Sequence, residues 1–218
     1  MQIISSENTD IAFIQEPYVY QNRIKGITGN YRIYGYGEDR SRAAIIPNDT
    51  IDTLMITQCS DDDIVLLEIK VGQATFCTAS AYMDFNDAIV NYFKKIERIL
   101  EFTKGAKIIL AIDSNSRSTT WYDVTTNERG RLLEEFVASN QLHIINEESL
   151  RTTFHSIRGQ SNIDIAITNR MLAAIENWEI SEEESASDHK IIKFNLKIEE
   201  DEENIIKTPE LRYIIKEH

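Results

Sequence analysis

The chain of 218 residues has few cysteines, a deficit of basic residues and no long apolar run. Its two cysteines, Cys59 and Cys77, fall in strand-like segments, which indicates buried free thiols in a reducing compartment. A disulfide framework and a thiolate zinc site are thereby excluded. No apolar stretch approaches the roughly 20 residues that cross a bilayer, so we expect no membrane segment. Because the N-terminus also lacks a basic stretch followed by an apolar core, we expect no secretory signal or transit peptide, and an intracellular location.

The basic residues number 23 against 36 acidic residues, which gives a formal charge of −13. This balance argues against a polyanion-binding protein, because such proteins usually present a basic face. The acidic excess, however, includes short runs that we expect to be solvated: Asp61–Asp63, Glu182–Glu184 and Glu199–Glu203. Basic residues close to the motifs described below are Arg117, Arg129, Arg131, Arg158 and Lys190.

Strand-like apolar runs dominate the sequence and are interrupted by two amphipathic segments. The predicted strands are 10–15, 42–46, 64–71, 75–82, 107–112, 142–145, 163–168 and 191–196. One helix is predicted around an apolar stripe from Ile89 to Leu100, with Gly105 as its stop, and a second over about 131–139. This alternation favours a single α/β domain over 1–197, a sandwich of two sheets with helices outside. From Ile198 the acidic composition predicts a linker or tail over 198–218.

Polar and acidic residues stand where several apolar strands begin or end. Glu16 follows the first strand, Asp113 and Asn115 follow the strand at 107–112, and Asp164 lies in Asn-Ile-Asp-Ile. A carboxylate beside a buried strand is costly unless it is paired, hydrogen-bonded or bound to a cation. A single such residue would indicate a loop cap or a turn, but several together favour a shared site. Ser187-Asp188-His189 adds a carboxylate and an imidazole before the last apolar strand.

Five short motifs occur in a defined order: Gln-Glu-Pro-Tyr at 15–18, Ser-Ala-Tyr at 80–82, Ile-Asp-Ser-Asn at 112–115, Asn-Ile-Asp-Ile at 162–165 and Ser-Asp-His at 187–189. This series resembles the endonuclease/exonuclease/phosphatase superfamily, which includes the apurinic/apyrimidinic endonucleases and DNase I. The resemblance extends from about Asp10 to Leu196 and implies a DNase I-like sandwich. Within the superfamily, Gln-Glu-Pro-Tyr, the stretch 114–121 and Arg-Gly-Arg-Leu-Leu at 129–133 look most like endonuclease domains of insect-type non-LTR retrotransposons.

The resemblance implies hydrolysis of a phosphodiester with a hard divalent cation, Mg²⁺ or alternatively Mn²⁺. Glu16 is then the main metal ligand and Asp188 a second. The plain alternative for Glu16 is an exposed glutamate that opens a Pro-Tyr turn. The attacking water is oriented or deprotonated by Asp113, and Asn115 holds that water or a phosphate oxygen. In an extended segment these two residues project to one side, and the alternative is an Asx-rich turn.

By the same resemblance, Asp164 fixes the tautomer of His189, which contacts the phosphate or exchanges a proton. Which of His189 and Asp113 is the base stays open, and a surface Asp-His pair is the alternative. Tyr82 is expected to donate its hydroxyl to the scissile phosphate or to tune a metal ligand, unless it is a core residue.

We expect four further residues to contact the substrate: Arg117, Trp121, Tyr122 and His155. Trp121 and Tyr122 could either stack on bases or fill a local cluster. His155 begins a segment that in relatives forms a DNA-facing hairpin.

The chain departs from the family pattern at its start. Relatives open with a strand that bears Gln-x-Asn and a helix, whereas only nine residues precede Asp10 here. We therefore expect either an N-terminally truncated domain or another segment in that sheet position. The functional expectation is a DNA endonuclease that nicks target sites for retrotransposition, coupled to a reverse transcriptase domain and nuclear where it acts on DNA. The alternatives are a catalytically silent DNA- or protein-binding remnant and a small-molecule phosphoesterase of the same superfamily.

Overall fold

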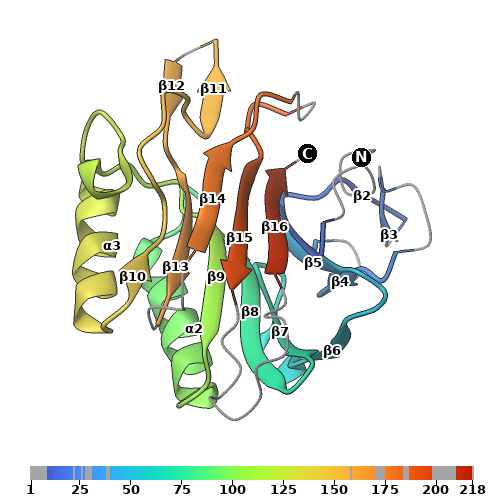
Figure 1. Ribbon diagram of the computed structural model, residues 1–218. Helices are drawn as coiled ribbons and strands as arrows, with labels where there is room; N and C mark the ends of the chain where they lie inside the picture. Colours follow the sequence, from blue (N-terminus) through green and yellow to red (C-terminus); the bar gives the residue numbers. More distant parts are fainter. Residues whose placement is uncertain are drawn as a thin grey trace.

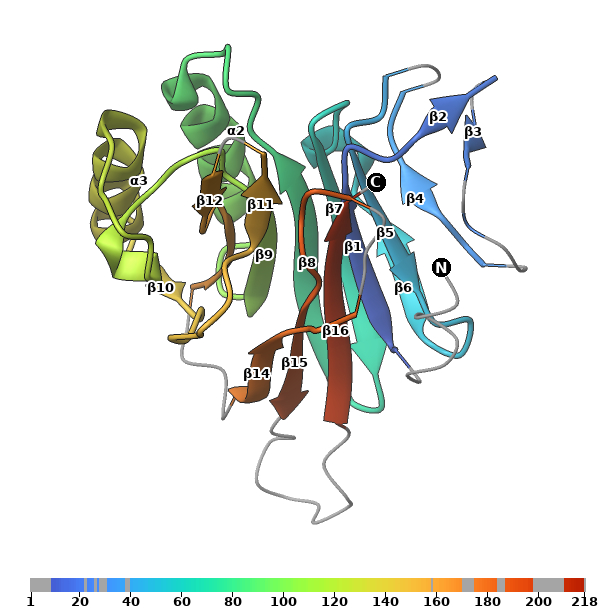
Figure 2. The ribbon, with the colours of Figure 1, turned by 90° about the horizontal axis from the view of Figure 1, so that it is seen from above.

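In the part of the chain that the structure describes, two six-stranded sheets pack face to face, with two α-helices on one side (Figures 1 and 2). The computed structural model describes residues 9–21, 23–25, 27, 31–37, 40–157, 159–169, 175–183, 187–197 and, for the backbone, 210–217. The α/β sandwich expected from the sequence is confirmed. In the described residues, no helix is long and apolar enough to cross a membrane.

The first sheet has the strand order β14-β15-β16-β1-β5-β4. In that order its strands are Ile175–Ile180, Ile192–Lys197, Glu210–Glu217, Ile11–Gln15, Ala43–Pro47 and Tyr34–Gly35. The second sheet has the order β10-β13-β9-β8-β7-β6. Its strands are His143–Ile144, Asp164–Thr168, Ile108–Asp113, Ala74–Tyr82, Ile64–Val71 and Asp52–Met55. Two small hairpins are β2 with β3, Val19–Tyr20 and Arg23–Ile24, and β11 with β12, Phe154–Ser156 and Gly159–Ser161.

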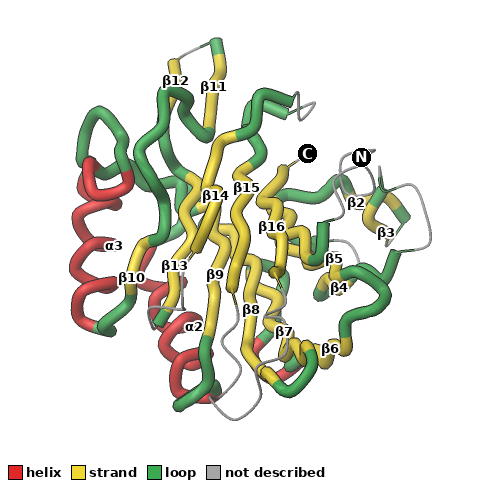
Figure 3. Tube along the Cα trace, viewed as in Figure 1, coloured by secondary structure: helices red, strands yellow, loops and turns green. Residues whose placement is uncertain are grey.

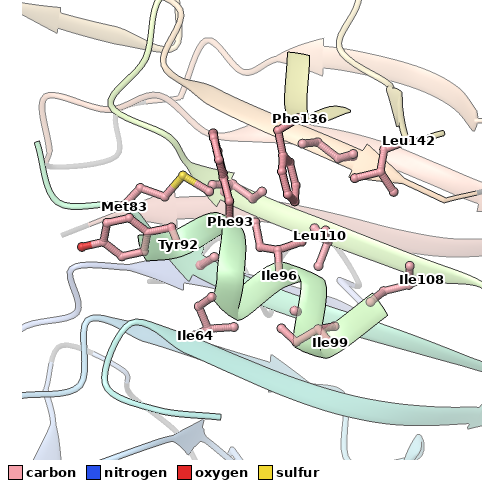
Figure 4. Packing of buried hydrophobic residues seen from close by; sticks show 14 of the residues in the cluster. Ile64, Met83, Tyr92, Phe93, Ile96, Ile99, Ile108, Leu110, Phe136 and Leu142 are labelled. Atoms are coloured by element: carbon pink, nitrogen blue, oxygen red, sulfur yellow. The ribbon is translucent and has the colours of Figure 1, made fainter. Parts of the chain in front are cut away.

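The two helices both cover the outer face of the second sheet (Figure 3). Helix α2, Ile89–Phe102, connects the parallel strands β8 and β9, and α3 spans Glu128–Ser139. In α2 the buried residues Ile89, Tyr92, Phe93, Ile96 and Ile99 recur at helical spacing, as the sequence predicted. The rings of Phe93 and Phe136 stack at 4.3 Å between centroids and join the two helices (Figure 4).

A second apolar layer lies between the inner faces of the sheets. Phe13 and Ile45 of the first sheet pack there against Leu67, Phe76 and Ile109 of the second. The outer face of the first sheet is covered differently, because Ile24, Ile27, Tyr31 and Ile33 pack over its apolar residues. The expectation of helices outside therefore holds for one sheet, and in the described residues a non-helical segment covers the other.

The C-terminal segment corrects the expectation of a tail over 198–218. Residues 198–209 lie outside the described residues, but 210–217 form β16 inside the first sheet. This strand runs parallel to β1, with Ile11 opposite Tyr213 and Gln15 opposite Glu217, and antiparallel to β15. The sheet position for which the sequence offered no N-terminal strand is thus filled by another segment of the same chain. Branched residues at 214 and 215 favour this pairing over a solvated tail.

The strand directions bring the polar residues of the motifs to one edge of the sandwich. Strands β8 and β9 end there with Tyr82 and Asp113, which are register partners. Because β13 is antiparallel to β9, it begins at that edge, with Asp164 opposite Asp113. In the first sheet the end of β1 and the start of β15 share one edge, since both lie opposite the end of β16, to which β1 is parallel and β15 antiparallel. We refer to this edge below as the catalytic edge.

Hydrogen bonds of two buried polar side chains join the two sheets beside this edge. The buried amide of Gln15 donates from Nε2 to the Ser80 hydroxyl at 2.9 Å and to the Ala111 carbonyl at 3.2 Å. The Ser80 hydroxyl in turn donates to the carbonyl of Ile14 at 3.1 Å. These bonds satisfy groups that would be costly to bury alone, and they fix the end of β1 against β8 and β9.

Candidate active site

Three candidate catalytic side chains form a buried cluster at the catalytic edge. The ligand atoms of Asp113, Asp164 and His189 all lie within 4.8 Å of one another. Both carboxyl groups are almost completely buried, and His189 retains 9% of its surface. Because buried carboxylates need partners, their grouping indicates a functional site rather than a set of caps.

The imidazole of His189 is oriented by Asp164. Its Nδ1 lies 3.1 Å from Oδ1 and 3.0 Å from Oδ2 of the carboxylate. The ring also meets Phe154 edge-on, with centroids 4.7 Å apart. A carboxylate at Nδ1 places the proton on that nitrogen and leaves Nε2 as the atom that can exchange a proton.

Tyr82 connects this cluster to Glu16. Its side chain is 8% exposed and makes a hydrogen bond to Glu16. Burial raises the pKa of the Tyr82 phenol far above its usual value, and the bond to Glu16 and the charges of Asp113 and Asp84 raise it further. The phenol therefore stays protonated and serves as a hydrogen-bond donor. Glu16 and His189 thus lie on one face of the molecule, linked through Tyr82, Asp113 and Asp164.

Glu16 has a backbone conformation that glutamate rarely adopts. Its φ is +45°, in the left-handed region, and its amide donates to the carbonyl of Arg42 at 2.9 Å. The side chain is exposed and lines an open cavity of about 670 Å³ together with Pro17, Tyr18, Arg40 and Arg42. Such strain persists only where neighbouring structure imposes it, and it is frequent in functional sites.

Asp113 and Asn115 are brought together by a turn and not by strand alternation. Strand β9 ends at Asp113, and Asn115 has a φ of +47°. The backbone amide of Asn115 donates to Asp113 Oδ1 at 3.0 Å, and its Nδ2 donates to Oδ2 at 3.3 Å. The argument from an extended segment was therefore wrong, and the Asx-type turn weighed as an alternative is present. This turn nevertheless places the Asn115 amide against the Asp113 carboxylate.

Asp188 lies beside the cluster but outside it. Its side chain is exposed, and its carbonyl accepts the amide of His155 at 2.8 Å. Asp188 is not one of the three residues whose ligand atoms converge. Its role as a second metal ligand stays a prediction.

The predicted substrate-binding residues divide into buried and accessible ones. Trp121 is 1% exposed, and its indole donates to the carbonyls of Ser116 and Asn162 at 3.2 and 3.0 Å. It fills a local cluster, so the prediction that it contacts substrate is corrected: the ring has no free face for a base. Tyr122 is 45% exposed and has a φ of +63°.

Arg117 and His155 also lie on the accessible side. Arg117 pairs with Asp123 at 3.1 Å and donates to the carbonyl of Gln160 at 3.3 Å, which ties it to the β11-β12 hairpin. His155 is exposed on that hairpin, which projects beyond the sheets (Figure 1). These two residues remain candidates for substrate contact.

Two arginines near the site received no role from the sequence. The Arg42 guanidinium forms ion pairs with Asp63 and Asp84 and lies over the Tyr82 ring, 5.4 Å from its centroid. Arg129 donates to backbone carbonyls of the loops that follow β8 and β9. Its place in the Arg-Gly-Arg motif was the one available signal, because neither arginine lies next to a catalytic residue in the sequence.

Comparison with known proteins places this geometry in a family. Residues 76–193 match the model of the family described as endonuclease-reverse transcriptase. The endonuclease domain of TRAS1, a telomere-specific non-LTR retrotransposon, superposes with a TM-score of 0.79 at 26% identity, covering 90% of each chain. The human Nocturnin catalytic domain shares the fold, with a TM-score of 0.60 and 13% identity over 89% of this chain and 83% of its own.

Two curated insect proteins are similar over most of this chain. One is the retrovirus-related Pol polyprotein from the type-1 retrotransposable element R1 of Bradysia coprophila, 26% identical over 192 residues, which are 82% of this chain and 19% of the polyprotein. The other is a putative 115 kDa protein in element R1DM of Drosophila melanogaster, 26% identical over 83% of this chain and 18% of that protein. This chain therefore spans about a fifth of the relatives it matches.

The family model covers 118 of the 218 residues, and the solved structures confirm the DNase I-like sandwich expected from the motifs. The residues that carried the resemblance also meet at one edge of that sandwich. The chain belongs to the endonuclease-reverse transcriptase family of the endonuclease/exonuclease/phosphatase superfamily.

Proposed function

We propose that this protein is a metal-dependent DNA endonuclease that nicks one strand of a duplex and leaves a free 3′ hydroxyl. The observation that carries the proposal is the continuous cluster from Glu16 through Tyr82 and Asp113 to Asp164 and His189 at the catalytic edge. It contains a carboxylate at the surface, a protonated phenol, a buried carboxylate held by an amide, and an oriented imidazole. This set suits hydrolysis of a phosphodiester.

The residues at the edge fit a hard divalent cation. Glu16 offers carboxylate oxygens in the lining of the open cavity, and Asp188, next to His189 in the sequence, is a further exposed carboxylate. Oxygen donors of this kind suit Mg²⁺, which needs few protein ligands, and also Mn²⁺. We assign Glu16 as the main ligand and Mg²⁺ as the ion. When bound, such an ion supplies charge stabilisation for the phosphate oxygens.

Asp113 and Asn115 are assigned to the attacking water. The two hydrogen bonds from Asn115 hold both carboxylate oxygens of Asp113 in place. Asp113 can then orient the water and accept its proton, while Asn115 keeps the carboxylate aligned and its Oδ1 can accept a hydrogen bond from that water.

His189 and Tyr82 are assigned to the phosphate. Because Asp164 contacts Nδ1, we assign the Nε2 of His189 to the phosphate or to the leaving oxygen. The Tyr82 phenol, kept protonated by burial, donates a hydrogen bond to Glu16. In the proposed reaction the His189 imidazole stabilises the negative charge that develops on the phosphate, and the Tyr82 hydroxyl turns from Glu16 to the same oxygens.

We propose that DNA lies along the catalytic edge between two accessible features. One is the cavity lined by Glu16, Tyr18 and Arg40, and the other is the β11-β12 hairpin with His155. Arg40 offers a local positive charge despite the overall charge of −13. By analogy with the Pol relatives, we further propose a reverse transcriptase domain as the functional partner and the nucleus as the place of action.

Supercoiled plasmid provides the test. Incubation with Mg²⁺ should give the nicked circle, which DNA polymerase I can extend from its 3′ hydroxyl, whereas EDTA should abolish nicking. Asp113→Ala and His189→Ala should each lower the rate at least 100-fold, on the order of magnitude of lost acid-base catalysis. Retention of plasmid without cleavage would replace this proposal with a DNA-binding remnant. Hydrolysis of small phosphoesters without nicking would replace it with a small-molecule phosphoesterase.

A further inference from the structure

Arg129 is the second residue of α3, and its side chain points back to the loops of the catalytic edge instead of into solvent. It is half-buried, and each of its three nitrogens donates a hydrogen bond. Nε donates to Ser114 O at 3.3 Å, and Nη1 donates to Asp87 O at 2.7 Å. Nη2 donates to Met83 O at 3.1 Å and to Asp84 O at 3.0 Å.

The acceptors of these bonds flank the candidate catalytic residues in the chain. Met83 follows Tyr82 directly, and Ser114 lies between Asp113 and Asn115. The Met83 carbonyl also accepts Asn115 Nδ2 at 3.2 Å, and the Met83 amide donates to the Asp113 carbonyl at 2.9 Å. Arg129 therefore joins the loop after β8 to the loop after β9 where Tyr82, Asp113 and Asn115 are held.

The start of α3 is itself fixed against the second of these loops. The side chain of Asn127 caps the helix by accepting the amide of Gly130 at 2.7 Å, and it also accepts the amide of Arg117 at 3.2 Å. A Cβ at Gly130 would lie 1.9 Å from the Arg117 carbonyl oxygen, so this approach requires glycine. Arg129 thus acts from an anchored position.

We propose that Arg129 is a positioning residue for the hydrolysis of DNA, holding the backbone of the two loops so that Tyr82, Asp113 and Asn115 face the same phosphate. This inference rests on the proposed function. The planar guanidinium suits the task, because its five donors in a rigid fork bind several carbonyls at once, whereas a lysine ammonium has three donors on a flexible stem. All three nitrogens are engaged with the protein, so Arg129 acts on the loops and not on DNA.

The test compares Arg129→Met and Arg129→Lys with the control Arg131→Met in the full chain. Arg131 lies on the same helix, but its ion pairs are to Glu128 and Glu135 of that helix. All variants are assayed well below their melting temperatures for kcat and KM in plasmid nicking. Backbone amide hydrogen exchange is measured over 83–87 and 113–118, a readout that does not depend on catalysis.

Arg129→Met should lower kcat by about 10- to 100-fold with KM within about threefold of the parent, because misplacement by about 1 Å can cost that much. Exchange should accelerate over 83–87 and 113–118, Arg129→Lys should be intermediate, and Arg131→Met should match the parent. A rise in KM at unchanged kcat would overturn the proposal in favour of a DNA contact. Unchanged exchange in both segments would overturn it as well.

Two results of this test would require a different measurement to decide: a variant that does not fold, and a parent protein that does not nick DNA. If Arg129→Met does not fold, the kcat, KM and exchange rates of Arg129→Lys decide instead. Lysine keeps the positive charge but lacks the forked donors of the guanidinium. If the parent protein does not nick DNA, the proposed function fails, and the exchange data alone then decide whether Arg129 holds the two loops.

Discussion

The bond between Asp164 and His189 crosses from one sheet of the sandwich to the other. Asp164 opens β13 in the second sheet, and His189 lies just before β15 in the first. Their contact at 3.0 Å, together with the bond of Tyr82 to Glu16, joins the two halves of the candidate site. The catalytic edge therefore depends on the packing of the two sheets as well as on the individual residues.

Substitution of Asp164 by asparagine should inactivate the enzyme without unfolding it. The amide is nearly isosteric, but it no longer supports the Nδ1-protonated imidazole or its charged form. We expect kcat to fall by about 100- to 10,000-fold, the range of general acid-base catalysis. Plasmid nicking measures the loss, and Asp49→Asn, at an exposed ion pair with Arg32, is the control. Nicking within a few-fold of the parent would contradict the role of Asp164.

Glu16→Gln should weaken the binding of metal more than any other single substitution at the edge. Loss of one carboxylate charge should raise the Mg²⁺ concentration for half-maximal nicking by about tenfold or more. Asp188→Asn should raise it less, because we assign Asp188 only as a second ligand. A Mg²⁺ titration of the nicking rate measures both. If Glu16→Gln and the parent required the same Mg²⁺ concentration for half-maximal nicking, Glu16 would be excluded as the main ligand.

Tyr82→Phe should separate catalysis from stability. The ring stays packed in the core and under Arg42, and only the hydroxyl that bonds Glu16 is removed. We expect kcat to fall by about tenfold or more, as for loss of one hydrogen-bond donor at a developing charge, with little change in melting temperature. Tyr36→Phe, at an exposed residue with no assigned role, is the control. A large drop in melting temperature with normal kcat would show that Tyr82 is a core residue only.

Stability should decline above pH 10, and Tyr92 should contribute to that decline. Burial raises the Tyr92 phenol pKa well above its ordinary value of 10.0. The hydroxyl donates to Asp87 Oδ2 at 3.0 Å and accepts the amide of Asp84 at 3.0 Å. Since the folded phenol keeps its proton while the unfolded one ionises, the stabilisation is complete below pH 10 and is lost as the pH rises towards the folded pKa.

Urea denaturation between pH 8 and pH 11 measures this effect. Tyr92→Phe should be less stable than the parent at pH 8 by about 1 kcal/mol, because two hydrogen bonds are lost. Its stability should then fall less steeply above pH 10. Parallel curves for the two proteins would contradict the contribution of Tyr92.

Much of the fold was predictable because its strands and helices have clear periodicity. The eight predicted strands all occur, with their ends within one residue of the expected positions. In α2 the stripe from Ile89 to Ile99 matched the buried face. The ordered motifs also predicted which residues meet, since strand direction brings Tyr82, Asp113 and Asp164 to one edge.

The remaining features depended on tertiary contacts that leave little local signal. In strand β14 two of the six residues are glutamates, and the strand pairs through a register shift between Glu176 and Glu179. Trp121 lies in a polar loop, and its burial depends on Asn162, 41 residues away. For Asn115 the turn geometry, which sequence spacing cannot give, decided the contact with Asp113. The role of Arg129 could not be predicted from the sequence, because its acceptors are backbone carbonyls, which every residue type has.

Strand β16 should be essential for the stability of the first sheet. Ile214→Pro removes a ladder hydrogen bond and constrains the backbone in the middle of a strand flanked on both sides, which should cost about 3 kcal/mol or more. Glu210→Pro is the matched control, because proline is tolerated at the first residue of a strand. Melting temperature and nicking rate should fall for Ile214→Pro and change little for Glu210→Pro. Equal melting temperatures for Ile214→Pro and the parent would show that β16 is dispensable.

The position of β16 has a consequence for the order in which the chain folds. The second sheet is assembled from 52–168, whereas β1 and β15 acquire the strand between them only when 210–217 become available. A growing polypeptide therefore carries two open strand edges until its synthesis has passed residue 217, and open edges are prone to pair with other chains. Because this closure joins segments about 200 residues apart, we expect it to be a late and slow event on the folding pathway.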